Sequence, residues 1–287
     1  QFGNLVVSMD RRIEAVQLSR HRKSRKRRPS MTAFYTTVAR YYDAENADKT
    51  DDIDFYTELA EEIDGPILDV GCGSGRVVLP LALNGYTVLG IDDNTAMLAR
   101  ARQRIARQPQ FYETLTLHEG DILTHQINET FSLILLTYNM LMHFHDVDAQ
   151  INLLQRMRQL IADSPNSRLV LDLPNAGEMF ATPDSDAITL ERTFIDPETG
   201  HMVMQQAVSV LDRATQLMRV TWIYDEIDGG SNVKRTVAPT VFRYFMPYEV
   251  QHLLTLTGFR VTEIYGDTDG SPFEDGCPRM MVLASPE

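Results

Sequence analysis

A glycine-rich segment near residue 70 has the residue types and spacing of a ligand-binding loop. Residues 69–75 read DVGCGSG, and the apolar run from Ile67 to Val70 predicts a buried strand that leads into it. Glycine lets the backbone approach a ligand closely, and a helix that starts after such a loop has N–H groups without helical partners. Asp92 ends the next predicted strand, 21 residues after Gly71, where a carboxylate can accept hydrogen bonds from ribose hydroxyls. This arrangement predicts a site for an adenosine-bearing ligand.

The spacing of the glycines narrows the class of ligand. Gly71, Gly73 and Gly75 follow G-x-G-x-G, whereas the dinucleotide pattern is G-x-G-x-x-G. The sequence contains no G-x-x-x-x-G-K-[ST], which excludes ATP binding through a P-loop.

Four segments, in order and at matching spacing, resemble the motifs of class I S-adenosylmethionine-dependent methyltransferases. They are residues 67–76, 88–98, 119–122 and 131–144. The resemblance covers residues 34–175 and resumes over 240–287, and it is nearest to the sugar-amine and glycine-type N-methyltransferases. It implies S-adenosylmethionine as cofactor and S-adenosylhomocysteine as product.

The resemblance also implies roles for individual residues in a cofactor site. Asp69 and the backbone of the glycine loop would hold the amino-acid end of the cofactor, and Asp92 would bind the ribose hydroxyls. The resemblance also places Asp93 and Tyr138 in the cofactor site. Cys72 is better explained as a small buried residue of the tight loop than as a nucleophile.

The adenine end of the cofactor is assigned by the same resemblance. Asp121 would accept a hydrogen bond from the adenine amino group, Ile122 would donate its backbone N–H, and Met97 would pack on the ring. For Met97 the alternative is a core methionine on an apolar helical stripe.

His143 is the candidate catalytic residue. Methyl transfer from a sulfonium needs a positioned nucleophile, and it needs a base only when the acceptor arrives protonated. His143 falls where several small-molecule N-methyltransferases place a histidine, and histidine titrates near neutral pH. The alternative is a structural histidine near the start of the next helix.

Three further residues are candidates for substrate binding. Residues 34–42 resemble an N-terminal lid of this family, in which Tyr35 and Tyr42 would present hydroxyls to the substrate. Plain aromatic packing is the alternative for both tyrosines. Arg243 would meet a substrate carboxylate, with a structural salt bridge as its alternative.

The elements that position these residues predict an α/β fold. Strand-like and helix-like segments alternate from residue 66 to residue 173, and two more strands follow near the C-terminus. Residues 188–245 instead alternate with a period of two, which predicts three or four antiparallel strands. We therefore expect a doubly wound, Rossmann-like, seven-stranded and mostly parallel sheet, with an antiparallel β insertion after strand five.

The predicted organisation has four parts. We expect a basic, disordered extension, a cofactor-binding core with an N-terminal lid, a β insertion over the active site, and a C-terminal helix with the last two strands. These parts are residues 1–30, 31–185, 186–245 and 246–287. The helix predicted for residues 75–84 contains Pro80, which is tolerated without a lost hydrogen bond only in the first turn.

Charge is distributed unevenly along the 287 residues. The whole chain has a formal net charge of −13, but residues 1–30 contain nine Lys and Arg against two acids. The remaining acidic body repels phosphate backbones, which disfavours nucleic acid as the main substrate. The basic segment is either a nucleic-acid arm or sequence upstream of a biological start at Met31, and we favour the second explanation.

Other classes of protein are excluded by composition. The longest apolar-looking stretch is too short for the roughly 20 residues of a membrane span. Two cysteines in 287 residues indicate a reducing, cytoplasmic setting. Asp172 and Asn175 lack the third acid that a catechol-type metal site needs, so we expect no metal.

These observations favour an enzyme that transfers a methyl group to nitrogen or oxygen of a small-molecule acceptor, with a possible homodimer through the β insertion. One alternative is an RNA or protein methyltransferase that uses the basic arm. Another is a catalytically silent cofactor-binding partner subunit. The identity of the acceptor stays open at this point.

Overall fold

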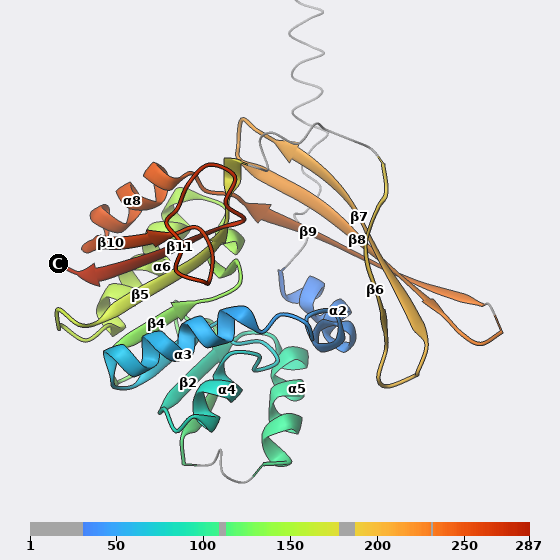
Figure 1. The fold of residues 1–287 in the computed structure, drawn as a ribbon, viewed down its shortest axis with the longest axis horizontal. Helices are drawn as coiled ribbons and strands as arrows, with labels where there is room; N and C mark the ends of the chain where they lie inside the picture. Colours follow the sequence, from blue (N-terminus) through green and yellow to red (C-terminus); the bar gives the residue numbers. More distant parts are fainter. Residues whose placement is uncertain (1–30, 109–112, 178–186, 231) are drawn as a thin grey trace, which may run out of the picture.

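The computed structural model describes residues 31–108, 113–177, 187–230 and 232–287. Two sheets organise this part of the chain, one of seven strands and one of four. Figure 1 shows the seven-stranded sheet on the left and the four-stranded sheet on the right, with helix α2 (Met31–Glu45) between them.

The seven-stranded sheet has the order β10-β11-β5-β4-β1-β2-β3. All its pairings are parallel except those of β11, which is antiparallel to both β10 and β5. This confirms the predicted Rossmann-like, mostly parallel sheet. In such sheets, ligands bind beyond the carboxyl ends of the strands at the point where the strand order reverses, which here lies between β1 and β4. The strands are β1 (Ile67–Val70), β2 (Val88–Asp92), β3 (Leu115–Glu119), β4 (Leu133–Leu136), β5 (Arg168–Pro174), β10 (Phe259–Tyr265) and β11 (Arg279–Pro286).

Helices cover both faces of this sheet. Apolar residues of α3, α4 and α5 form one buried cluster with β1 and β2, and those of α6 and α8 form another on the opposite face. All four residues of β1 and all four of β4 are buried, as expected for strands covered on both sides. The helices are α3 (Asp51–Ile63), α4 (Val78–Leu83), α5 (Thr95–Ala106), η2 (Met140–His143, a 3-10 turn), α6 (Val147–Leu160) and α8 (Pro247–Leu256).

Local sequence signals explain where two of these helices begin. Helix α4 begins at Val78, three residues later than predicted, so Pro80 lies in its first turn, where a backbone N–H has no helical partner to lose. Helix α5 is capped by Asn94, whose side chain accepts the N–H of Met97 at 3.0 Å.

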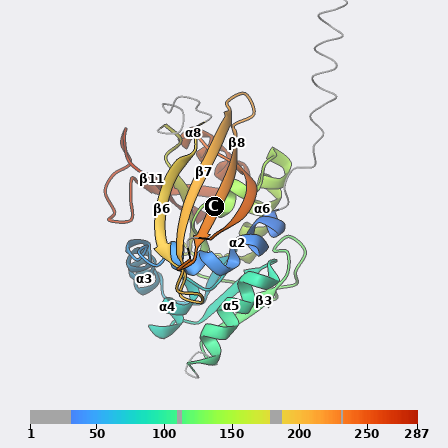
Figure 2. The ribbon, with the colours of Figure 1, turned by 90° about the vertical axis from the view of Figure 1, so that its right-hand side faces the viewer.

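The insertion is the four-stranded antiparallel sheet, with neighbouring strands in sequence order. Figure 2 shows it face-on, with α2 beneath it. Its inner face packs on α2, and the rings of Tyr41 and Tyr224 stack with centroids 4.7 Å apart. This packing holds α2 near the strand ends of the large sheet. The strands are β6 (Thr189–Ile195), β7 (Met202–Asp212), β8 (Leu217–Ile227) and β9 (Val233–Arg243).

Some of the predictions lie outside the described residues. The basic segment 1–30 is one, and the boundary between residues 185 and 186 is another.

Candidate active site

The glycine loop forms one wall of a cavity at the carboxyl end of β1. Gly71, Gly73 and Gly75 have φ of 77°, 56° and 83°, the left-handed region that favours glycine. A Cβ on Gly71 would lie 2.6 Å from Sδ of Met140, so a side chain there would disturb the cavity wall. Gly71 and Gly73 line the cavity, whereas Gly75 packs against Leu79 of α4.

The N–H groups of this loop are already used within the protein. Those of Gly71 and Cys72 donate to the carbonyl oxygen of Ile91 at 2.7 and 3.1 Å. The N–H of Gly73 donates to Oδ2 of Asp92 at 2.8 Å. These three N–H groups are therefore not free for a ligand, because strand β2 accepts them. The loop supplies a close backbone surface instead.

Asp92 lies at the end of β2 with both carboxylate oxygens held. Oδ2 accepts the N–H of Gly73, and Oδ1 accepts the N–H of Asn94 at 2.7 Å. Burial raises the pKa of the carboxyl to about 6 against the opposing effect of these two bonds. Each oxygen has a second lone pair, and the side chain lines the cavity. A fixed carboxylate of this kind can accept hydrogen bonds from two neighbouring hydroxyls of a ligand.

Asp69 is the most deeply buried acid of the cavity, with 1% of its surface exposed. Oδ1 accepts from Oγ1 of Thr137 at 3.2 Å, and Oδ2 has no hydrogen-bond partner among the described residues. Burial raises the pKa of this carboxyl to about 7. A buried, half-satisfied carboxylate is costly, and a cationic ligand group would relieve that cost.

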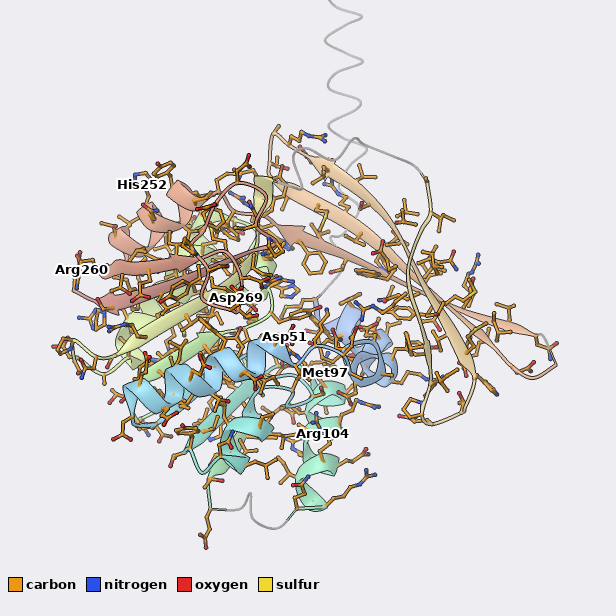
Figure 3. The ribbon with its side chains drawn as sticks, viewed as in Figure 1. Asp51, Met97, Arg104, His252, Arg260 and Asp269 are labelled. Atoms are coloured by element: carbon orange, nitrogen blue, oxygen red, sulfur yellow. The ribbon has the colours of Figure 1, made fainter. Side chains whose placement is uncertain are left out.

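The opposite end of the cavity is more apolar. Ile122 and Met97 are almost fully buried there, and Figure 3 places Met97 at the end of α5 that lies beside α2. Asp121 is exposed and its Oδ1 accepts the N–H of Leu123 at 2.9 Å. Asp93 accepts from Oγ1 of Thr32 on α2 at 3.2 Å.

This first cavity contains about 860 Å³ of space, part of it open to solvent. Every residue that the sequence analysis assigned to the cofactor lines it, apart from Gly75. Those residues are Asp69, Gly71, Gly73, Asp92, Asp93, Met97, Asp121, Ile122 and Tyr138.

A second cavity, of about 1190 Å³, adjoins the first beneath the β insertion. Tyr35, Tyr42 and Tyr138 line both cavities and so form the wall between them. Burial raises the pKa of Tyr35 well above its usual value and that of Tyr42 to about 12, so both hydroxyls stay protonated. The far walls of the second cavity include Trp222 and Phe242 of the insertion.

The loop after β4 is strained where it joins this wall. Tyr138 and Asn139 are consecutive non-glycine residues with φ of 44° and 70°. Asp172, 2% exposed, holds them: its Oδ2 accepts the N–H of Tyr138 at 2.9 Å, and its carbonyl oxygen accepts the N–H of Asn139 at 3.0 Å. Tyr56 and Arg279 also bind the Asp172 carboxylate. This network fixes Tyr138 at the boundary of the two cavities.

Comparison with known proteins identifies the fold. Residues 67–164 match the profile of the family described as methyltransferase domain. The chain carries a methyltransferase domain. A curated relative, an uncharacterized methyltransferase of Bacillus cytotoxicus, is 32% identical over 87 residues, or 29% of this chain. The chain spans 38% of that relative's length.

Solved structures share the fold of this methyltransferase domain and of the insertion. The CcbJ methyltransferase of Streptomyces caelestis aligns with a TM-score of 0.71 and 19% identity, over 88% of this chain and 98% of that one. The S-adenosylmethionine-bound amino pentose methyltransferase CalS10 of Micromonospora echinaspora aligns with a TM-score of 0.64 and 18% identity, over 85% and 94%. The sugar N-methyltransferase KedS8 of a Streptoalloteichus species gives 0.65 and 15%, over 85% and 90%. The domain has the fold of S-adenosylmethionine-dependent methyltransferases.

The residues of the first cavity fit S-adenosylmethionine. It carries a cationic amino group and sulfonium, two ribose hydroxyls and an aromatic base. The unpartnered oxygen of buried Asp69 suits the amino group, and the fixed carboxylate of Asp92 suits the hydroxyls. The apolar surfaces of Met97 and Ile122 suit the adenine ring.

His143 lines the first cavity of the methyltransferase domain, but its titration differs from the expectation. Nε2 lies 3.0 Å from the hydroxyl of Tyr35, and Nδ1 has no partner among the described residues. Burial lowers the pKa of the imidazole to about 4, so the ring is neutral near pH 7 rather than poised to titrate there. A neutral ring in this place holds the hydroxyl of Tyr35.

Arg76 is a residue of the first cavity that the sequence analysis missed. It makes two hydrogen bonds to Asp52, at 2.7 and 2.6 Å, and lies over the ring of Tyr138. Its position directly after Gly75 could have indicated from the sequence that it lies in this cavity.

The second cavity contains charged residues that the sequence analysis also missed. Glu45 and Lys49 come from the end of α2 and the turn after it, and Arg192 comes from β6. These residues are brought together by contacts across more than a hundred positions of sequence, which no local pattern signals.

Arg243 lies outside both cavities. It is 6% exposed and pairs with Glu249 of α8, and it also donates to Oε1 of Gln216 at 3.2 Å. The structure therefore gives it the structural salt bridge rather than a contact with substrate.

No helix in residues 31–108, 113–177, 187–230 or 232–287 is long and apolar enough to cross a membrane. Within the same ranges, no three side chains of His, Cys, Asp or Glu come together as metal ligands.

Proposed function

We propose that this protein transfers the methyl group of S-adenosylmethionine to nitrogen or oxygen of a small-molecule acceptor. The observation that supports this best is the pair of adjoining cavities, which share Tyr35, Tyr42 and Tyr138 in their walls. The first fits the cofactor, and the second has room for an acceptor beneath the insertion.

The residues at the dividing wall would act by positioning and by excluding water. When bound, the cofactor supplies an electrophilic methyl group on a sulfonium. The hydroxyl of Tyr35, held by His143, can accept or donate a hydrogen bond to the acceptor atom that attacks. Tyr138, fixed by Asp172, closes the wall from the side of the sheet.

Production of S-adenosylhomocysteine with a panel of small amines and alcohols tests this proposal. Asp92→Ala is the matched negative control, because it removes hydrogen bonds to the ribose that are each worth about 1.5–3 kcal/mol. We expect this variant to bind the cofactor at least tenfold more weakly, by calorimetry, with its fold intact. Parent-like binding would show that Asp92 does not hold the ribose.

The acidic body of the chain supports a small acceptor over RNA. Residues 31–287 carry 38 acids against 18 bases, and the basic segment 1–30 lies outside the described residues. A protein that binds the cofactor but turns over no acceptor, whether small molecule, RNA or protein, would be a silent binding subunit.

We propose further that two copies can pair through the insertion and that the protein works in the cytoplasm. Ile195, Met202 and Val233 are exposed and share one face of the insertion, which suits pairing of two copies and is tested by light scattering. Both cysteines are free, as expected of a cytoplasmic protein.

A further inference from the structure

The second cavity contains the partly buried carboxylate of Glu45, which forms no ion pair with the described residues, although Arg192 and Lys49 lie near enough to favour its charged form. Oε2 of Glu45 accepts from Nε2 of Gln205 and from the hydroxyl of Tyr224, both at 2.9 Å. Both bonds end on Oε2, and the side chain of Asn46 also stabilises the charged carboxylate, which leaves further lone pairs of Oε1 for a ligand. Glu45 lines the cavity, so a ligand there can reach it.

The two cations of this cavity are directed elsewhere. The Lys49 ammonium contacts the hydroxyl of Tyr138 and lies 4.2 Å from the centre of its ring. Arg192 donates to the backbone carbonyl of Glu45 and lies 3.3 Å from Oδ1 of Asp48. Within the described part of the chain, no Lys, Arg or His nitrogen forms an ion pair with the Glu45 carboxylate.

We propose that Glu45 binds a positively charged nitrogen of the acceptor, and that the acceptor is an organic amine with an apolar or aromatic body. This rests on the proposed function. A buried carboxylate without a paired cation is unfavourable, and a ligand ammonium would supply the missing charge. The aromatic walls around Glu45 suit such a ligand, because cations and apolar groups both pack well on aromatic rings. Those walls are Phe34, Tyr42, Trp222, Tyr224 and Phe242.

The protonation of Glu45 supports this assignment. Burial raises its pKa to about 7, against the opposing effects of Tyr224, Arg192, Lys49 and Asn46. The carboxylate is therefore partly protonated near neutral pH without a ligand, and an ammonium would favour its charged form. Amine binding is then expected to strengthen as pH rises through 7, as long as the amine itself stays protonated.

The experiment uses 2-phenylethylamine as the probe and 2-phenylethanol as its uncharged counterpart. Their binding to the full chain is measured by ligand-observed NMR and calorimetry at saturating S-adenosylhomocysteine. The parent protein should prefer the amine, and Glu45→Gln should weaken amine binding by about tenfold or more while leaving alcohol binding unchanged. Glu191→Gln is the matched control, because Glu191 lines the same cavity but is exposed on β6. It should change neither affinity.

Tyr224→Phe gives a second test that does not remove the carboxylate. Loss of this hydroxyl removes one bond that stabilises the charged form of Glu45, so the pH at which amine binding appears should move upward. An unchanged pH profile would count against the proposal. Equal binding of amine and alcohol by the parent, or equal losses in Glu45→Gln and Glu191→Gln, would overturn it.

These outcomes are distinct from those that test methyl transfer. Amine binding that depends on Glu45, in a protein that never forms S-adenosylhomocysteine, would refute the proposed function and leave the cation site. Turnover of acceptors with an unaltered amine affinity in Glu45→Gln would refute the cation site alone.

Discussion

At the scale of single residues, the first cavity is built around acids that the fold stabilises poorly. Asp69 is buried with one oxygen unpartnered, and its pKa is raised from 3.8 to about 7. Below about pH 4 the carboxyl is protonated in both the folded and the unfolded chain, so it has no effect on stability. Between about pH 4 and pH 7 the unfolded chain releases the proton and the folded chain keeps it, so stability falls as pH rises. Above pH 7 the penalty is complete.

Replacing Asp69 by asparagine tests this account. Without cofactor, Asp69→Asn should be more stable than the parent at about pH 8, by roughly 2–4 kcal/mol, and the difference should shrink as pH falls toward about 5. Urea unfolding across this range measures it. The same variant should bind S-adenosylmethionine at least tenfold more weakly, because the neutral amide no longer pairs with a cation. Identical pH dependence in both proteins would show that Asp69 is not the group responsible.

His143 and Tyr35 form a second pair whose roles can be separated. If His143 acts as a titrating base, His143→Ala should lower kcat by about 10² to 10⁴, and this loss should shrink as pH rises. A neutral ring that only holds Tyr35 predicts a loss of about tenfold, constant with pH and matched by Tyr35→Phe. We expect the second result. Cofactor affinity should stay near the parent value in both variants. A steep, pH-dependent loss of kcat confined to His143→Ala would instead support His143 as a general base.

Site residues can be predicted from the sequence where the local backbone conformation itself forms part of the site. The glycine loop and the acid at the end of β2 were predicted because a positive φ and a strand end leave local signals. The role of Asp172 was not, because it depends on β5 pairing with β4 and bringing Asp172 next to Tyr138. The neutral state of His143 likewise depends on burial by distant elements.

At the scale of elements, α2 is held over both cavities by charged contacts with the insertion. Arg40 pairs with Asp196 and lies 3.3 Å from Glu226, and both acids are nearly buried. His201 also binds Glu226, at 2.9 Å. Because α2 separates the cavities from solvent on this side, these ion pairs oppose its opening.

Arg40→Met should release this restraint. It leaves two buried acids without their guanidinium, which we expect to cost about 2–4 kcal/mol in the free energy of unfolding. It should also raise the dissociation rate of S-adenosylmethionine, measured by stopped-flow fluorescence. Arg100→Met is the matched control: Arg100 joins α5 to Asp43 of α2 and to exposed Glu198, and its loss should cost less than about 1 kcal/mol. Equal effects of the two substitutions would contradict a specific role for Arg40.

The elements were predicted from the sequence, but the contact that joins α2 to the insertion was not. A family resemblance predicts the lid segment at 34–42, and periodicity predicts the strands of 188–245. That Tyr41 stacks on Tyr224, and so sets α2 above the strand ends, is a contact across 183 positions of sequence. Neither segment shows that pairing by itself.

At the scale of the whole molecule, charge separates the first 30 residues from the rest. A variant that begins at Met31 should fold, bind cofactor and turn over a small acceptor like the full chain, because no described residue that lines either cavity precedes Met31. Calorimetry and turnover measure this. Loss of activity on truncation, or RNA binding by the full chain with a steep salt dependence that the truncated chain lacks, would favour the nucleic-acid arm.

The two cavities draw on different stretches of the chain. Among the described residues, those that line the first lie between 31 and 144, whereas much of the second comes from residues 191–242. Mutations in the insertion that spare its contacts with α2 can therefore accumulate over generations while the lining of the first cavity stays unchanged. Under the proposed function, exchange between relatives of the gene segment that encodes the insertion would change which acceptor is preferred. Lineages with this architecture are thus free to diversify their acceptors rapidly while the donor site remains under constant selection.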